Sequence, residues 1–150
     1  MPTYKAPLRD INFCFKEMFE TDRLRALPGY EEVTDDLIDA ILTEAAKLCE
    51  NELFPANQKG DEEGCTWTNG EVRTPSGYKE LYKAFVESGW GSLAGDPAYG
   101  GQGLPDALAL LTEEMVCAAN ISFSLYPGLT RGSYILAYSW QRGAKATLPA

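Results

Sequence analysis

Histidine is absent from this chain of 150 residues. Without an imidazole, the sequence cannot form a Ser-His-Asp or Cys-His catalytic group, a histidine-ligated metal site or an imidazole proton shuttle. Basic residues are also scarce, because 13 Lys and Arg stand against 22 Asp and Glu and leave a net charge of −9. Since that charge repels phosphate backbones and anionic lipid surfaces, we expect no nucleic acid among the partners.

Cysteine pairs and long apolar runs are missing as well. The cysteines are scattered without a C-x-x-C motif, which predicts reduced, mostly buried thiols rather than a zinc site or a disulfide framework: Cys14, Cys49, Cys65 and Cys117. No stretch approaches the roughly 18 uninterrupted apolar residues of a membrane span, and no apolar run follows the lysine near the N-terminus. We therefore expect a cytoplasmic protein without a membrane span.

What remains is the composition of an ordinary globular domain, with 45% hydrophobic and 23% charged residues. Helical apolar spacing then predicts an all-α fold. Asp10 is expected to cap a first helix, and Thr34 a second that ends at Phe54-Pro55. Thr74-Pro75 is expected to open a third helix that ends before Gly89.

The second half of the chain carries the most apolar segments. Residues from Pro105 to Asn120 are apolar around most of the helical circumference, which predicts a central helix buried by the others. The stretch from Ile121 to Tyr138 is expected to be helical in two pieces, because Pro127-Gly128 interrupts it. A polar excursion precedes these helices, with Trp67 and Val72 as apolar anchors and a hairpin closed by Asn69-Gly70. The predicted fold is an up-and-down-like bundle of five or six helices.

Two groups of residues are candidates for chemistry. The glycine-rich loop from Gly89 to Pro105 could cradle a phosphate, but no strand precedes it, so we interpret it as a tight connection between helices. Glu113 and Glu114 could provide a buried base, lie on the surface or pair with Arg131; without a facing nucleophile or metal, the structural roles are favoured. Several aromatic residues could wall an apolar tunnel or fill a core, and their spacing favours the core: Phe123, Tyr126, Tyr134 and Tyr138.

The order of motifs in this part of the chain resembles a known family. Gly89-Trp90 is followed by Asp-Pro-Ala-Tyr-Gly-Gly-Gln-Gly-Leu-Pro from Asp96, by Thr-Glu-Glu-Met from Thr112, and by Tyr-Pro-Gly-Leu-Thr-Arg-Gly from Tyr126. This order resembles the N-terminal helical domain of flavin-dependent acyl-CoA dehydrogenases. Residues 1–34 resemble the N-terminal extension of the branch that includes 3-methylmercaptopropionyl-CoA dehydrogenases, which leaves 35–138 as the helical domain.

The resemblance implies α,β-dehydrogenation of an acyl-CoA thioester. In that reaction a carboxylate removes the α proton while the flavin accepts the β hydride. The family holds FAD mainly in a middle β-domain and a C-terminal helical domain, and its base comes from the C-terminal half. The resemblance therefore implies FAD and a homo-oligomer for the intact enzyme, but no bound cofactor, no catalytic residue and no activity for this chain alone.

By position, the segment after the central helix corresponds to the family's acyl-chain wall. The implied substrate-binding residues are consecutive in the sequence: Phe123, Ser124, Leu125, Tyr126, Pro127 and Gly128. An alternative function is a non-catalytic helical interaction module that binds an acyl-CoA or a partner subunit. The exposed apolar area distinguishes the two, because a domain separated from its neighbours exposes a large patch.

The last residues depart from the family. After Tyr138 the family usually continues with a sequence like His-Gly-Ser-Glu-Glu-Gln-Lys, whereas this chain has Ser-Trp-Gln-Arg-Gly-Ala-Lys from Ser139. If suitable codons encode the family's usual sequence, reading the same nucleotides from one base earlier produces the sequence of this chain. We therefore expect residues 139–150 to be an out-of-frame tail, which the nucleotide sequence would test.

Overall fold

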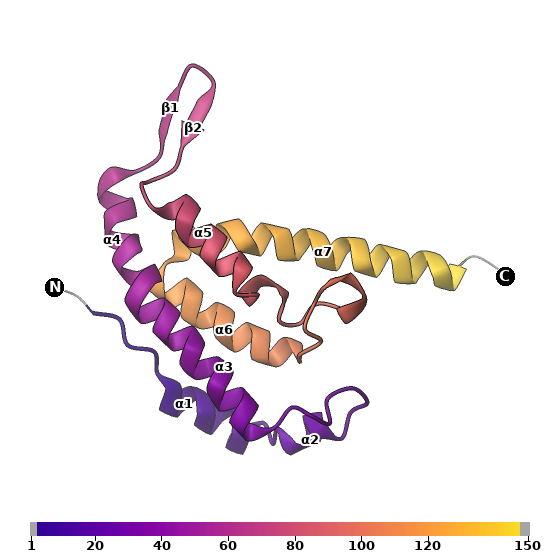
Figure 1. Ribbon diagram of the computed structural model, residues 1–150. Helices are drawn as coiled ribbons and strands as arrows, with labels where there is room; N and C mark the ends of the chain where they lie inside the picture. The colour runs from indigo at the N-terminus through magenta and orange to yellow at the C-terminus, as the bar shows by residue number, and fades with distance from the viewer. Residues whose placement is uncertain (1–2, 148–150) are drawn as a thin grey trace.

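The computed structural model describes residues 3–147, with side chains as far as Gln141, and its regular structure is helical apart from one short pair of strands (Figure 1). The all-α prediction is therefore confirmed. The elements are α1 (Leu8–Asn12), α2 (Asp22–Arg25), α3 (Asp35–Leu48), α4 (Phe54–Glu63), β1 (Thr66–Thr68), β2 (Glu71–Arg73), α5 (Tyr78–Glu87), α6 (Asp106–Ala119) and α7 (Ile121–Thr147). Helices α3, α5, α6 and α7 form the body of the bundle, and β1 and β2 project from one end (Figure 1).

Helix α1 begins earlier than the sequence predicted. Pro7 occupies the N-cap, where its carbonyl accepts hydrogen bonds from the Asp10 and Ile11 amides at 3.0 and 2.9 Å. Asp10 lies inside the first turn, where its carboxylate still faces the positive end of the helix dipole. The predicted cap at Asp10 is therefore wrong, because the backbone of Pro7 already starts the helix. The chain then continues through a π-helical turn, Phe13–Met18.

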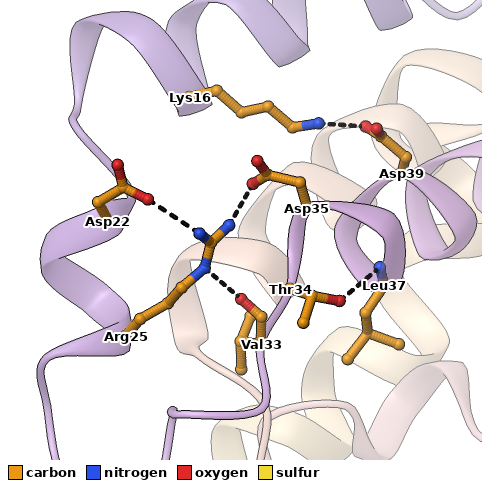
Figure 2. Close-up of polar contacts among 8 residues, drawn as sticks. All are labelled: Lys16, Asp22, Arg25, Val33, Thr34, Asp35, Leu37 and Asp39. Atoms are coloured by element: carbon orange, nitrogen blue, oxygen red, sulfur yellow. Dashed lines mark hydrogen bonds and ion pairs between the residues drawn. The ribbon is translucent and has the colours of Figure 1, made fainter.

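Arg25 ties the N-terminal segment to the start of α3. Its Nε donates to the Val33 carbonyl at 2.9 Å, and its two terminal nitrogens contact the carboxylates of Asp22 and Asp35 (Figure 2). A planar guanidinium can hold three such acceptors at once. Arg25 thereby links α2 to the residues that begin α3.

The predicted cap of α3 is confirmed. The Thr34 hydroxyl accepts a hydrogen bond from the Leu37 amide at 3.2 Å (Figure 2), and Asp35 and Asp36 occupy the first turn. Ile38 and Leu42 on this helix are buried in the same core cluster as Ile11, Phe15 and Val33 of the preceding segment. The segment before α3 therefore shares its hydrophobic core with the rest of the bundle.

Helix α3 does not end at Phe54-Pro55 as predicted. A π-helical turn, Cys49–Leu53, joins α3 directly to α4. Pro55 stands in the first turn of α4, where a missing N–H is tolerated, and the wider π turn absorbs the change in hydrogen-bonding pattern. The proline therefore changes the local winding without ending the helix.

The predicted hairpin forms, but its apolar residues anchor nothing. Asn69 and Gly70 have φ of 52° and 84°, as a type I′ turn requires. Trp67 pairs with Val72 across the two short strands, and both side chains are exposed. The expectation that they anchor the polar excursion is wrong, because the hairpin stands away from the bundle (Figure 1).

Helix α5 begins three residues later than Pro75. Gly77 has φ of 88°, a left-handed conformation that prevents the turn at Thr74-Pro75 from continuing as a helix. The predicted end is confirmed, since Gly89, with φ of 78°, lies one residue beyond the C-cap Ser88.

Helix α6 is the central helix that the sequence predicted. Its buried residues extend around most of the circumference and pack against α3 and α7: Leu108, Ala109, Thr112, Met115, Val116 and Ala119. Only a narrow stripe is exposed along the described helix: Asp106, Leu110, Glu114 and Ala118.

Helix α7 runs through Pro127 as one helix of 27 residues, so the predicted division into two pieces is wrong. A helical proline removes one hydrogen bond, here the one to the Phe123 carbonyl. Phe123 and Ser124 are buried against the bundle, and this packing holds the turn that precedes the proline. The expected tail continues as α7 backbone to Thr147, and 148–150 lie outside the described residues.

The cysteines and the predicted absence of a membrane span are the remaining expectations from the sequence. All four thiols are free, but only Cys49 is fully buried and Cys65 is exposed, so the expectation of mostly buried cysteines is only partly met. Along the described chain, no helix is both long enough and apolar enough to span a membrane.

Candidate functional site

A cavity of about 240 Å³ lies between α6, α7 and the loop that joins α5 to α6. Its walls are mainly apolar, and each of these elements supplies several of the lining residues. Helix α6 contributes Ala109, Thr112 and Val116, helix α7 contributes Ser124, Pro127, Gly128, Arg131 and Tyr134, and the loop contributes Trp90, Leu93 and Gly95 among others.

The loop can form a wall because its two arms pair with each other. The amides of Gln102, Gly103 and Leu104 donate to the carbonyls of Ser92, Gly95 and Leu93 at 3.0, 2.9 and 2.9 Å. A Cβ at Gly101 would lie only 2.0 Å from the Gly95 carbonyl carbon, so this position excludes any side chain. The interpretation as a tight connection is confirmed, and the same compaction also closes the cavity on one side.

Two tyrosines of α7 hold this loop. The Asp96 amide donates to the Tyr134 hydroxyl at 2.9 Å, and the Tyr138 hydroxyl donates to the Asp96 carboxylate at 3.2 Å. The two rings stack, with their centroids 5.7 Å apart. The expectation that these aromatic residues fill a core is therefore wrong for Tyr134 and Tyr138, which are only partly buried and fasten the loop to α7.

Charged groups gather at Arg131, which lines the cavity. Its guanidinium contacts the Glu113 carboxylate at 2.6 Å and the Asp106 carboxylate at 3.2 Å. Of the roles open to Glu113 and Glu114, Glu113 is thus a partner of Arg131, while Glu114 is exposed. With Asp96, the lining carries three carboxylates and one cation, a formal charge of −3 + 1 = −2.

Asn120 sets the direction in which α7 leaves α6. It is 1% exposed; its amide nitrogen lies 3.1 Å from the Leu53 carbonyl and 3.2 Å from the Tyr78 hydroxyl, and it donates to both. Its side-chain oxygen accepts from the Phe123 amide at 2.9 Å and so caps α7. The carbonyl comes from the π turn between α3 and α4, so one side chain joins three parts of the bundle.

The structure brings together only some of the residues that the sequence assigned to substrate binding. Ser124, Pro127 and Gly128 line the cavity. Phe123 is fully buried in the core and contacts the Phe85 ring at a centroid distance of 5.5 Å. Leu125 is 62% exposed and faces outward.

Tyr126 lies in a different place from the cavity. It lines a second hollow with Thr74, Lys79, Tyr78 and Tyr82. Burial, with smaller contributions from Cys65 and Tyr78, raises the pKa of its hydroxyl. The six consecutive residues therefore divide among the cavity, the core, the outer face and this second hollow, as the 3.6-residue period of a helix requires.

Sequence reasoning did not identify the other walls of the cavity. Leu93 is buried and Trp90 is half-buried in the loop, and neither belongs to a periodic pattern. The usable signal was the six glycines of the loop, which allow the backbone to approach a neighbouring element closely. That signal predicts close approach without saying which residues the loop meets.

The outward face of α7 is strongly apolar. Four large side chains follow one another at helical spacing, and each is more than half exposed: Leu125, Leu129, Leu136 and Trp140. We call these four residues the outer stripe. These four residues place exposed apolar surface along one side of α7.

No protein-family model matches the sequence. The 3-methylmercaptopropionyl-CoA dehydrogenase of Ruegeria pomeroyi is 39% identical over 131 residues, which cover 87% of this chain and 22% of that enzyme. A butyryl-CoA dehydrogenase of Syntrophomonas wolfei is 31% identical over 134 residues, with the same coverage of 87% and 22%.

A more distant relative extends the comparison. The broad-specificity linear acyl-CoA dehydrogenase of Mycobacterium tuberculosis is 25% identical over 130 residues, 85% of this chain and 21% of that enzyme. The chain thus spans about a fifth of the length of the curated relatives that it matches. Over that span, the chain is homologous to the N-terminal region of the acyl-CoA dehydrogenases and belongs to their family.

Proposed function

We propose that this domain supplies part of the acyl-chain pocket of an FAD-dependent acyl-CoA dehydrogenase. The observation that carries the proposal is the cavity beside α7, whose wall includes Ser124, Pro127 and Gly128, in a chain homologous to these enzymes. An apolar cavity of this size suits a hydrocarbon chain, because each buried methylene contributes about 0.8 kcal/mol to binding.

In the reaction, the domain binds the hydrocarbon chain and excludes water from it. The mainly apolar lining removes the hydrocarbon chain from solvent, and the loop held by Tyr134 and Tyr138 keeps that wall closed. Of its carboxylates, Glu113 is held by Arg131 and Asp96 by Tyr138, so neither is presented as an uncommitted base. We propose that the base comes from another part of the enzyme.

The cavity does not fit FAD. The diphosphate of FAD requires uncommitted donors or cations, and Arg131, the cation that lines the described cavity, is paired with two carboxylates. The formal charge of −2 on the lining would also repel phosphate. We therefore assign FAD to the intact enzyme, and we propose that this chain alone holds none and is inactive.

The organisation that we propose keeps 1–34 as an extension and 35–138 as the helical domain. The hydrogen bonds of Arg25 and the ion pair between Lys16 and Asp39 at 2.6 Å (Figure 2) support a role of the extension in bracing α3. In the intact enzyme, Leu125, Leu129 and Leu136 of the outer stripe would pack against the flavin-binding parts or another subunit of a homo-oligomer.

The outer stripe leads to a prediction about the chain in solution. We expect it to self-associate or to bind a hydrophobic dye, because the stripe leaves a large apolar surface in contact with water. Replacing Leu129 and Leu136 with glutamine should reduce both effects, whereas the matched replacement of exposed Leu27 should not. Analytical ultracentrifugation would measure the self-association, and dye fluorescence would measure the dye binding. A wild-type chain that is strictly monomeric and binds no dye would favour the interaction module.

The function itself is tested with two proteins. The purified chain, mixed with FAD, butyryl-CoA or octanoyl-CoA and an artificial electron acceptor, should give no turnover above a blank without protein. A chimera in which this chain replaces the matched 131-residue segment of the Ruegeria enzyme should hold FAD and oxidise an acyl-CoA. The Ruegeria enzyme without that segment is the control.

Each outcome points to one function. Turnover by the chain alone would refute its proposed inactivity. A chimera that folds and holds FAD but oxidises no acyl-CoA would favour the interaction module instead. An active chimera, beside an inactive control, would support the pocket function.

A further inference from the structure

We propose that the second hollow, which lies between the first turns of α5 and of α7, is a binding site for a small aromatic monocarboxylate. Its volume is about 340 Å³. Three tyrosines, a threonine and a lysine line it, and we call it the tyrosine hollow: Thr74, Tyr78, Lys79, Tyr82 and Tyr126. Because Tyr126 projects from a different side of α7 than Ser124 and Gly128 do, this site is separate from the cavity and independent of the proposed function.

The first observation is the spacing of the aromatic rings. Tyr78 and Tyr82 lie one turn apart on α5, and the Tyr126 ring faces both of them from α7. The centroid distances are 6.4 and 6.5 Å, near the wide end of the range of about 4.5 to 7 Å for aromatic contacts. Tyr126 is 41% exposed and Tyr82 is partly exposed, so part of each ring is in contact with water. A planar aromatic ligand can cover these ring surfaces.

The second observation is a set of polar groups that the fold does not use. In the part of the chain that the structure describes, the Lys79 ammonium forms no ion pair, and the Thr74 and Tyr82 hydroxyls form no hydrogen bond. An ammonium group donates up to three hydrogen bonds, and each hydroxyl donates one. A carboxylate has two acceptor oxygens, and its bonds to a cation are stronger than those between neutral groups. The hollow thus offers a carboxylate one cation and two neutral donors.

The third observation is the charge of the hollow. Its lining has one cation and no carboxylate, a formal charge of +1, in a chain whose net charge is −9. Tyrosine rings also attract quaternary ammonium groups, but Lys79 repels a cation here. A phosphate monoester carries nearly two negative charges at neutral pH, of which Lys79 balances only one. A single carboxylate on an aromatic ring matches both the charge and the rings of the hollow.

The walls of the hollow are held in place by the rest of the bundle. The Tyr78 hydroxyl donates to the Ala56 carbonyl at 3.4 Å and accepts from the Asn120 amide nitrogen at 3.2 Å. The rings of Tyr78 and Tyr82 both contact the buried Phe123 ring, at centroid distances of 6.3 and 6.4 Å. Because these side chains are already ordered, binding costs little conformational entropy at this wall.

The experiment titrates the full chain with benzoate at neutral pH and measures the heat of binding by isothermal titration calorimetry. Benzyl alcohol is the neutral match of benzoate, and cyclohexanecarboxylate is its saturated match. Lys79→Gln removes the cation of the hollow, and Tyr126→Leu removes one of its rings. The matched control is Lys83→Gln, because Lys83 is exposed one turn further along α5 and lies outside the lining.

We expect the wild type to bind benzoate, and we expect Lys79→Gln to raise the dissociation constant about tenfold or more, because a charge-assisted bond is lost. Benzyl alcohol should bind to the wild type about tenfold more weakly than benzoate for the same reason. Tyr126→Leu and the change from benzoate to cyclohexanecarboxylate should each weaken binding roughly three- to tenfold, because each removes an aromatic contact. Lys83→Gln should bind benzoate as the wild type does.

Any of four results would overturn the proposal. They are no binding of millimolar benzoate by the wild type, equal affinities of Lys79→Gln and Lys83→Gln for benzoate, benzyl alcohol that binds as tightly as benzoate, and cyclohexanecarboxylate that binds as tightly as benzoate. Circular dichroism of the variants would show that each one folds. The comparison of the three probes needs only the wild-type chain, so it decides the matter even if a variant fails to fold.

Discussion

Replacing Asn120 with alanine is expected to lower the free energy of unfolding by about 3 to 5 kcal/mol. The change removes the cap of α7 and leaves the Leu53 carbonyl and the Phe123 amide without their partner in the interior. Loss of a cap costs roughly 0.5 to 2 kcal/mol, and each buried group left unpaired roughly 1 to 3 kcal/mol. Urea-induced unfolding, followed by circular dichroism, would measure the loss.

Thr34→Ala is the matched control for this prediction. Thr34 also caps a helix, but it lies on the surface, where its hydroxyl accepts from the Leu37 amide. Its loss should cost about 1 kcal/mol. If the two variants lose the same stability, Asn120 acts as a cap alone and the buried network contributes nothing.

Replacing Gly101 with alanine is expected to have the second large effect. The new Cβ would overlap the backbone of Gly95, at 2.0 Å from its carbonyl carbon, and backbone atoms cannot rotate away as a side chain can. The two arms of the loop must separate, which we expect to cost about 3 kcal/mol and to open one wall of the cavity. Unfolding in urea would measure the cost.

Gly91→Ala provides the comparison within the same loop. A Cβ there meets only a ring carbon of Phe85 at 3.8 Å, which is an ordinary contact. We expect this variant to change the stability by less than about 1 kcal/mol. Equal losses for the two glycines would mean that the close approach of Gly101 to Gly95 is not what holds the loop.

The features that the sequence predicts correctly depend on neighbouring residues. Thr34 caps α3, Asn69-Gly70 turns the hairpin and Gly89 follows the end of α5, because each acts through its own backbone or the next turn. The central position of α6 is also predictable, since apolar residues around most of a helix require cover on most sides.

The features that the sequence does not predict depend on distant partners. The prolines at 55 and 127 do not end their helices, because a π turn precedes the first and the buried residues Phe123 and Ser124 precede the second. The cavity depends on Asp96 meeting Tyr134, 38 residues further along the chain. No local sequence pattern contains such a contact. The resemblance to the family therefore predicts the wall of the cavity that α7 forms, whereas the sequence leaves the wall formed by the loop unassigned.

The bonds of Asn120 also bear on the order of events in folding. The Leu53 carbonyl and the Asn120 amide are 67 residues apart, so their hydrogen bond closes a long loop and forms only after the entropy of that closure has been lost. We therefore expect the start of α7 to form late, after α3 and α6 have packed together. Because such late contacts are weak in the transition state, the stability that they contribute acts mainly to slow unfolding rather than to speed folding.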